Sequence, residues 1–279
     1  MNDVFIYLSL IELICKQMTK YFIITFLFLF SPTSKVLAQF GFSHEIGAIV
    51  GPEAFQSDYG ERHNFSTNIG NTGYGIGIIH YLNFSYKADC SCFTPETYFN
   101  DHFKLRSELS YNKTNLKHYG EWVDPSKTSL TADQLRAMRG STEVTNIGMQ
   151  LEFFPYSIRD FTATVGSFGP FISLGGQFSF YSPKAYSQMG PGLGQLETVT
   201  PTKYIGAFDT KGGTTWSVVS SVGTRYKLTP LSDLMLDLRF QYYFSNWVDG
   251  LSPNPKIYLE NRANDWLVWV NFGYIYYLQ

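Results

Sequence analysis

The chain has 279 residues and a formal net charge of −2, with only 16% charged but 18% aromatic residues. Ordinary soluble domains have about 25% charged residues, and a nucleic-acid-binding protein needs a basic surface that this near-neutral balance does not supply. A mean hydropathy of −0.11 excludes a protein built of many membrane-spanning helices. A glycine-rich, aromatic and charge-poor chain favours an all-β protein, particularly a membrane β-barrel.

The N-terminal segment has the features of a signal peptide. Lys20 precedes ten mostly apolar residues, 21–30, and Val36 and Ala38 occupy the −3 and −1 positions of a cleavage site. Ten residues are too few for a helical anchor, which needs about 20. We therefore predict a signal peptide over residues 1–38.

The mature domain is expected to cover residues 39–279. Met18 begins a better signal-peptide start than any residue before it. We therefore expect residues 1–17 to come from an upstream choice of start codon.

Eight runs of alternating residues follow in the mature domain. Such period-2 alternation predicts β-strands with two different faces, and each run is close to the 9–11 residues or so that a tilted strand needs to cross a bilayer. The runs are residues 42–50, 72–82, 103–112, 146–154, 171–181, 215–226, 234–244 and 266–278.

The two faces of these runs differ in kind. In residues 234–244, Leu236 and Leu238 alternate with Asp237 and Arg239, and across the runs the less apolar face is rich in Gly and Ser. A soluble β-sandwich would instead place bulky apolar residues inside and polar ones outside. We predict one all-β domain, an eight-stranded antiparallel transmembrane β-barrel whose narrow lumen is packed with side chains.

Four acids and four bases lie on the less apolar face. A buried unpaired charge costs several kcal/mol, so the balance predicts pairing across strands inside the barrel. The predicted lumen charge network is Glu45, Lys104, Arg106, Glu108, Glu152, Arg225, Asp237 and Arg239. A salt-bridged plug is the favoured interpretation, and an ion pathway is the alternative.

The connections between the runs alternate in length. Membrane barrels place long loops outside and shorter turns on the periplasmic side, and an even number of strands leaves both termini in the periplasm. The connection 113–145 contains Thr131 and Gln134 at capping-box spacing and Gly140 at a C-cap position, which predicts one short helix.

Two cysteines, Cys90 and Cys92, remain in the mature domain. They predict two surface thiols or a local disulfide in an oxidising compartment, with intermolecular links or half a metal site as alternatives. A zinc site needs about four ligands, and no second cysteine cluster exists to complete one. We predict no metal site and no cofactor.

No catalytic constellation stands out in the sequence. His44, His80 and His102 fall near the periplasmic ends of the first three strands, where histidines are interpreted as interfacial residues. We therefore predict a protein that is not an enzyme. A lipid-modifying enzyme is the hypothesis that we rank last.

The C-terminal stretch NFGYIYYLQ resembles the signal by which the outer-membrane barrel assembly machinery recognises its substrates. Asn271, Gly273, Tyr276 and Leu278 carry this spacing, although Leu278 and the trailing Gln279 differ from an aromatic last residue. The same stretch also fits the lipid-facing side of a last strand, and both interpretations can hold together.

Several segments resemble the PorG-type outer-membrane barrels of Bacteroidetes, and more closely an uncharacterised flavobacterial branch of that group. They are HEIGAIVGPEAFQSDYG, QLEFFPYSIRDF, VGTRYKLT and NFGYIYYL. The resemblance implies an eight-stranded barrel whose periplasmic side attaches to a ring lipoprotein of the type IX secretion and gliding motility machinery. The ADCSC segment and the loops 113–145 and 182–214 depart from the PorG pattern.

Together these observations predict a non-enzymatic outer-membrane protein that anchors or supports a periplasmic secretion or motility assembly. The alternative is a small surface adhesion barrel, or a narrow channel, that acts through its long extracellular loops. The expected partners are outer-membrane lipid, the barrel assembly machinery and the ring lipoprotein, and no nucleic acid.

Overall fold

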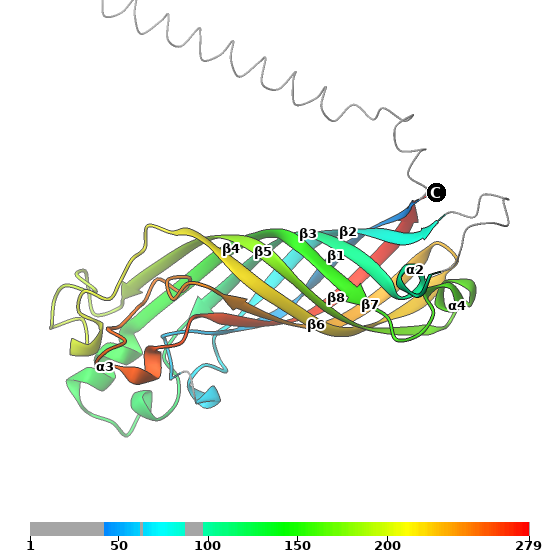
Figure 1. Cartoon of the computed structure of the whole chain (residues 1–279). Coiled ribbons are helices and arrows are strands. Elements are labelled where there is room, and N and C mark those ends of the chain that lie inside the picture. Colours follow the sequence, from blue (N-terminus) through cyan, green and yellow to red (C-terminus); the bar gives the residue numbers. More distant parts are fainter. Residues whose placement is uncertain (1–41, 62–63, 87–96, 279) are drawn as a thin grey trace, which may run out of the picture. The chain divides into compact units, whose positions relative to one another are not determined.

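The computed structural model describes residues 42–61, 64–86 and 97–278, which form eight strands in one closed antiparallel barrel. Each strand pairs with its neighbours in the chain, and β1 pairs with β8 to close the barrel (Figure 1). The strands are β1 Phe42–Gln56, β2 Thr72–Tyr86, β3 Phe103–Leu116, β4 Met138–Phe153, β5 Phe168–Ser187, β6 Gly213–Thr229, β7 Ser232–Tyr243 and β8 Trp266–Leu278. The predicted fold class is confirmed. The predicted signal peptide, Cys90 and Cys92 lie outside the described residues.

Several strands are longer than the sequence pattern predicts. The β4 strand begins eight residues before the predicted run, and its added part carries Glu143 on the outer face, where Lys113 of β3 forms an ion pair with it at 3.0 Å. The apolar-polar alternation stops there because the outer face becomes polar, while backbone pairing continues. This extension of β4 therefore projects into water beyond the apolar band.

Two groups of aromatic side chains border the apolar outer face. At the end near the chain's last strand residue, Leu278, ring contacts join Phe42, Phe84, Phe99, Phe103 and Phe153. Toward the opposite end, ring contacts occur among Phe178, Phe180 and Trp216 and between Phe240 and Trp266. An exposed apolar band between two aromatic girdles is the surface of a barrel that spans a membrane.

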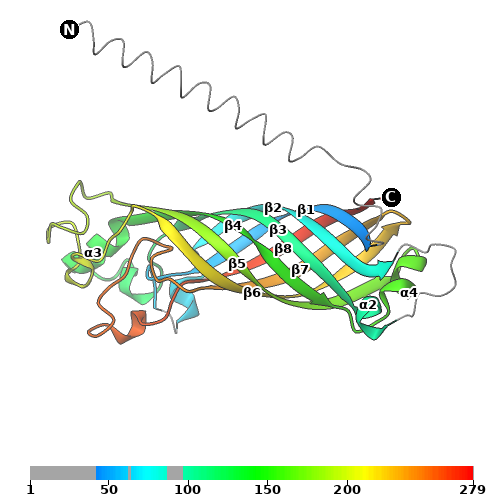
Figure 2. The ribbon, with the colours of Figure 1, turned by 45° about the horizontal axis from the view of Figure 1, so that its top comes forward.

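The two ends of the barrel differ strongly in size (Figure 2). One end, which we call the terminal end, holds both ends of the described chain, a two-residue turn at 230–231 and the short helices α2 (Tyr98–His102) and α4 (Ile158–Ala163). The other, the loop end, carries the connections 57–71, 117–137, 188–212 and 244–265. They contain α3 (Leu130–Ala137), η2 (Phe65–Thr67), η3 (Glu121–Val123), η4 (Thr202–Tyr204) and η5 (Leu259–Asn261). Of the described helices, none has the length and apolar character to cross a membrane.

The helix predicted in connection 113–145 exists, but its caps differ from the prediction. Ser129 is the N-cap, and its side chain accepts a hydrogen bond from the Ala132 N–H, which leaves Thr131 inside the helix. The helix ends at Ala137, and Gly140 lies in β4. A Cβ at Gly140 would lie 2.4 Å from the Tyr59 hydroxyl oxygen, so a close tertiary approach, and not a helix cap, requires this glycine.

Glycines on the inner face of the barrel leave room for larger side chains. A Cβ at Gly75 of β2 would lie 2.4 Å from ring carbons of Trp269, whereas one at Gly176, on the outer face of β5, would have only a backbone oxygen at 3.8 Å. Inner-face glycines of this kind are therefore packing positions.

We expect Gly75→Val to lower the free energy of unfolding by about 1–3 kcal/mol, the usual cost of overfilling a packed interior. Urea unfolding in lipid vesicles, followed by tryptophan fluorescence, measures this change. The matched control Gly176→Val should differ little from the wild type. Equal effects of the two substitutions would contradict a tightly filled lumen.

Candidate functional site

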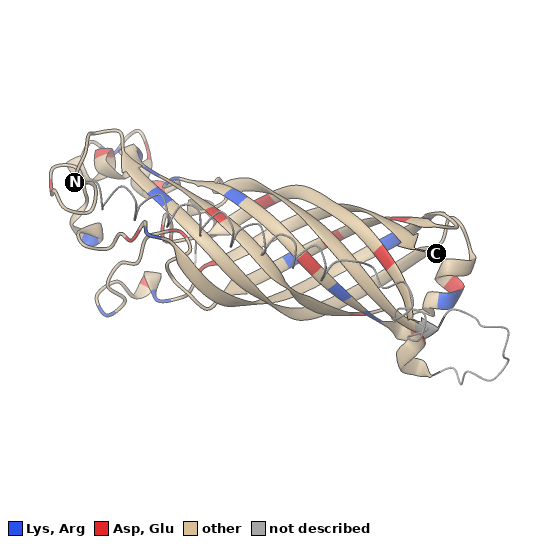
Figure 3. Cartoon of the chain, turned by 90° about the horizontal axis from the view of Figure 1, so that it is seen from above, with Lys and Arg blue, Asp and Glu red and all other residues tan. Residues whose placement is uncertain are grey.

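The structure places all eight residues of the predicted charge network inside the barrel. Their side chains come from β1, β3, β4, β6 and β7, and each is buried. Figure 3 shows charged positions spread along the strands of the barrel. Because a strand directs alternate side chains to opposite faces, the eight buried charges point inward and the exposed apolar residues between them point outward. The alternation of each strand alone accounts for this placement.

Glu45 and Arg225 join the charges nearest the terminal end. The Glu45 carboxylate contacts the Lys104 ammonium at 2.5 Å and the Arg225 guanidinium at 2.7 Å. Arg225 also reaches Glu152 at 3.3 Å, and its guanidinium lies 4.0 Å from the centre of the Tyr81 ring. These contacts connect β1, β2, β3, β4 and β6 through the interior.

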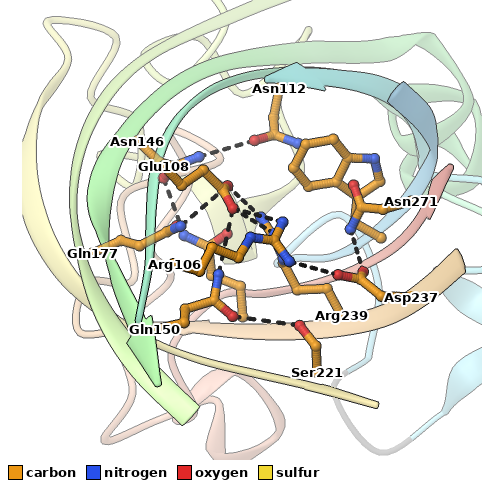
Figure 4. A network of polar contacts seen from close by, with 12 residues as sticks. Arg106, Glu108, Asn112, Asn146, Gln150, Gln177, Ser221, Asp237, Arg239 and Asn271 are labelled. Carbon is orange, nitrogen blue, oxygen red and sulfur yellow. Dashed lines mark hydrogen bonds and ion pairs between the residues drawn. The ribbon is translucent and has the colours of Figure 1, made fainter. Parts of the chain in front are cut away.

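Arg106 and Glu108 join the charges nearer the loop end (Figure 4). Arg106 contacts Asp237 and Glu108, both at 2.9 Å, and Glu152 at 3.5 Å. Both oxygens of Glu108 accept hydrogen bonds from Arg239, at 2.5 and 2.6 Å. Neutral side chains continue the network: Gln150 and Gln177 donate to Glu108, and Ser221 donates to Gln150.

Two members of this network, Lys227 and Asp233, were not among the predicted residues. Lys227 lies 3.2 Å from Asp233, which also contacts Arg225 at 3.6 Å, and all three side chains are buried. Both residues keep the inward parity of their strands, but they lie just beyond the predicted runs 215–226 and 234–244. With them, five acids and five bases form one connected set of ion pairs through the lumen.

Glu53 is a further buried acid, closer to the loop end. Its carboxylate accepts hydrogen bonds from the Thr114 hydroxyl at 2.6 Å and from the Asn112 amide. Glu53 was not predicted because the first predicted run ends at residue 50, whereas β1 continues to Gln56.

The three histidines near the terminal end do not form one site. His44 Nδ1 lies 3.0 Å from His80 Nε2, with the rings stacked, whereas His102 Nδ1 contacts the Phe154 carbonyl oxygen at 2.7 Å. Within the described ranges, no three His, Cys, Asp or Glu residues are grouped as metal ligands.

The four residues of the predicted assembly signal all lie on β8. Asn271 points into the lumen and donates a hydrogen bond to Asp237 at 2.6 Å, whereas Tyr276 and Leu278 are exposed on the outer face. A Cβ at Gly273 would lie 3.0 Å from the Met235 side chain. Recognition of these residues by the assembly machinery stays a prediction.

The four connections of the loop end fold together, and we call residues 57–61, 64–71, 117–137, 188–212 and 244–265 the loop cap. Asp58 lies at its centre: its N–H donates to Asp249 at 2.7 Å, and its carboxylate accepts from Asn261 at 2.7 Å and Asn246 at 2.9 Å. The Tyr204 hydroxyl donates to the Asp58 carbonyl at 3.3 Å. In the fourth connection, the Gln134 amide donates to the Glu197 carbonyl at 2.7 Å. The four connections are therefore one folded unit and not separate loops.

An open pocket of about 230 Å³ lies in the loop cap, with residues from all four connections in its lining. Aromatic rings contribute much of its wall, including those of Tyr119, Trp122 and Tyr204, and Glu61, Lys203 and Glu260 supply charged groups. This pocket could not be predicted from the sequence, because each connection contributes only a few residues to it and no motif joins them.

His118 is part of the pocket's lining and lies between two tyrosines. Its ring centre is 5.2 Å from that of Tyr59 and 5.5 Å from that of Tyr204. Burial, reinforced by the positive charges of Lys203 and Arg139, lowers the pKa of His118 from 6.5 to about 3. The imidazole is therefore neutral at physiological pH.

No model of a known protein family and no curated protein matches the chain. Among solved structures, it is similar to Neisserial surface protein A, with 13% identity over 84% of this chain and 96% of the other and a TM-score of 0.42. A major outer membrane protein from Thermus thermophilus shows 12% identity over 85% and 99%, with a TM-score of 0.42. OprG from Pseudomonas aeruginosa shows 11% identity over 85% and 98%, with a TM-score of 0.41. Likeness at this level carries no functional information, and the PorG resemblance stays a prediction.

We expect Arg239→Met to lower the free energy of unfolding by about 3–5 kcal/mol, because it removes one of the cations that pair with buried Glu108. The double variant Arg239→Met/Glu108→Gln should recover part of this loss, since it removes the stranded acid as well. Urea unfolding in lipid vesicles measures both changes. Unchanged stability of Arg239→Met together with a new conductance in planar bilayers would contradict a plugged lumen.

We expect the loop cap to loosen as the pH falls from about 7.5 to about 5. The ordinary pKa of His118 is 6.5, and its pKa in the folded cap is about 3. At pH values between these two, the unfolded cap binds a proton at His118 that the folded cap excludes. Stability is therefore lost as the pH falls, by at most about 1.4 kcal/mol per pH unit. Amide hydrogen exchange of residues 117–137 measures the loosening, and His118→Phe should flatten its pH dependence. An equally steep dependence in that variant would contradict the assignment.

Proposed function

We propose that the chain is a non-enzymatic outer-membrane protein that recognises a ligand or partner at the cell surface through its loop cap. The observation that carries this proposal is the folding of four separate connections into one unit, three of them joined at Asp58 and the fourth, 117–137, joined through Gln134. Loops that only join strands do not need a shared buried network, and ordered loops on a rigid barrel are where binding residues concentrate. The pocket among them supports the same function.

The lumen argues against the channel version of the surface hypothesis. Its ten connected charges are buried and lie within 4 Å of opposite partners, as the ion pairs Lys104–Glu45 and Arg239–Glu108 illustrate. Small barrels of eight strands have interiors just wide enough for side chains to fill. In this proposal the barrel anchors the cap, with both termini in the periplasm and the barrel assembly machinery inserting the chain through its last strand.

A second candidate function is the anchoring of a periplasmic secretion or motility assembly through the terminal end. Exposed aromatic residues favour it: Tyr98, before the third strand, is 65% exposed and Tyr156, after the fourth, is 68% exposed. The two segments are joined by the Arg159 N–H, which donates to Asp101 at 3.1 Å. Such a surface, together with the PorG resemblance, fits attachment of a ring lipoprotein.

A deletion strain complemented with two variants distinguishes the two functions, because one variant is altered at the loop end and the other at the terminal end. In the first variant, short turns replace residues 118–136 and 189–211, and in the second Tyr98 and Tyr156 become Ser. Our proposal expects the first variant to lose attachment to cells or surfaces while secretion and gliding stay normal. Heat-modifiable migration in gel electrophoresis checks that each barrel is folded. Normal attachment by the first variant, with loss of a co-purifying ring lipoprotein and of secretion in the second, would favour the second candidate.

A further inference from the structure

The pocket in the loop cap presents apolar rings and polar groups side by side. Trp122 is 55% exposed, and its indole N–H donates to Glu61 at 2.7 Å, so that the ring and the carboxylate are held together at the wall. Across the lining, Lys203 forms an ion pair with Glu260 at 2.8 Å. A ligand here meets flat apolar faces, carboxylate acceptors and an ammonium donor in one lining.

The charges of the pocket disfavour a charged ligand. The pocket's cation, the Lys203 ammonium, already has an anionic partner in Glu260. It also lies 5.5 Å from the centre of the Tyr204 ring and 5.2 Å from that of the Tyr258 ring. A ligand cation would be attracted by the two carboxylates, but the Lys203 ammonium already neutralises Glu260 and lies near the tyrosine rings on which such a cation would stack. A ligand anion would be repelled by the carboxylates of Glu61 and Glu260.

The volume of the pocket limits the size of the ligand. Pockets for drug-sized molecules span about 300–1,000 Å³, and this one measures about 230 Å³ and is open to solvent. It therefore suits one ring, or the terminal ring of a longer chain that continues into water. His118, neutral in the pocket's lining, adds no charge at physiological pH.

We propose that this pocket binds a single neutral saccharide unit, free or at the end of a glycan. A pyranose ring has an apolar C–H face that stacks on aromatic side chains such as Trp122, and hydroxyls that donate to carboxylates such as Glu61 and accept from ammonium groups such as Lys203. Fixed polar groups at the rim of an aromatic wall then select the positions of the hydroxyls. The inference rests on the proposed surface function and names its ligand class.

The test uses the full barrel in glycoside-free lipid nanodiscs, because sugar-headed detergents would occupy the pocket. Saturation-transfer NMR and calorimetry screen glucose, galactose, mannose, fucose and N-acetylglucosamine, with glucosamine, glucuronate and benzyltrimethylammonium as charged probes. We expect at least one neutral sugar to bind with a Kd on the order of 1 mM, the range of weak single-ring binding. Binding of the charged probes alone, or of no neutral sugar, would overturn the proposal.

Three variants locate the bound sugar. Trp122→Leu and Glu61→Gln should each weaken binding by about tenfold, which corresponds to about 1.4 kcal/mol. Trp247→Leu, an exposed tryptophan of the loop cap that does not line the pocket, is the matched control and should bind normally. Equal losses in Trp122→Leu and Trp247→Leu would overturn the assignment of the pocket.

The outcomes distinguish this inference from the function on which it rests. In one outcome, sugar binding depends on Trp122, yet cells with the variant lacking residues 118–136 and 189–211 attach normally. This outcome would uphold the saccharide pocket and refute the surface-recognition function. Loss of attachment in that strain without any neutral sugar bound to the intact barrel would refute the saccharide pocket alone.

Discussion

Two arginines, Arg106 and Arg225, organise the interior of the barrel, because each contacts three acids from different strands. Arg106 meets Glu108, Glu152 and Asp237, whereas Arg225 meets Glu45, Glu152 and Asp233. The shared acid, Glu152, makes one network of the two sets. Charges buried away from water are tolerable only when each has opposite partners at close range, so the strands must close around this network in a single register.

The filled lumen determines where the protein can act. Since the interior is occupied by paired side chains, interactions with other molecules are left to the two ends and the outer face. The apolar outer band and its aromatic borders belong to the membrane, which leaves the loop cap and the terminal end in water. The loop cap is by far the larger of the two, and its buried polar centre at Asp58 gives it a defined shape on which a binding pocket can be built.

Alternation predicted the eight strands and the side of the barrel on which each charge lies. It failed at strand ends: Lys227 and Asp233 keep the inward parity but adjoin the turn at 230–231, where too few alternating residues remain to define a run. The local capping pattern misplaced the ends of the helix as well. Thr131 and Gly140 fit a local capping pattern, but Ser129 caps the helix, and the Tyr59 hydroxyl accounts for the glycine.

The sequence by itself determined the fold class, the inward and outward faces and the balance of lumen charge. These properties depend on the two-residue period of a strand, which is local and repeats along each run. Only the tertiary structure decided which charges pair, that four connections fold into one cap, and that Trp122, Lys203 and Glu61 line one pocket. Such contacts join residues far apart in the chain, and they exist only after the barrel has closed and brought its loops to the same end.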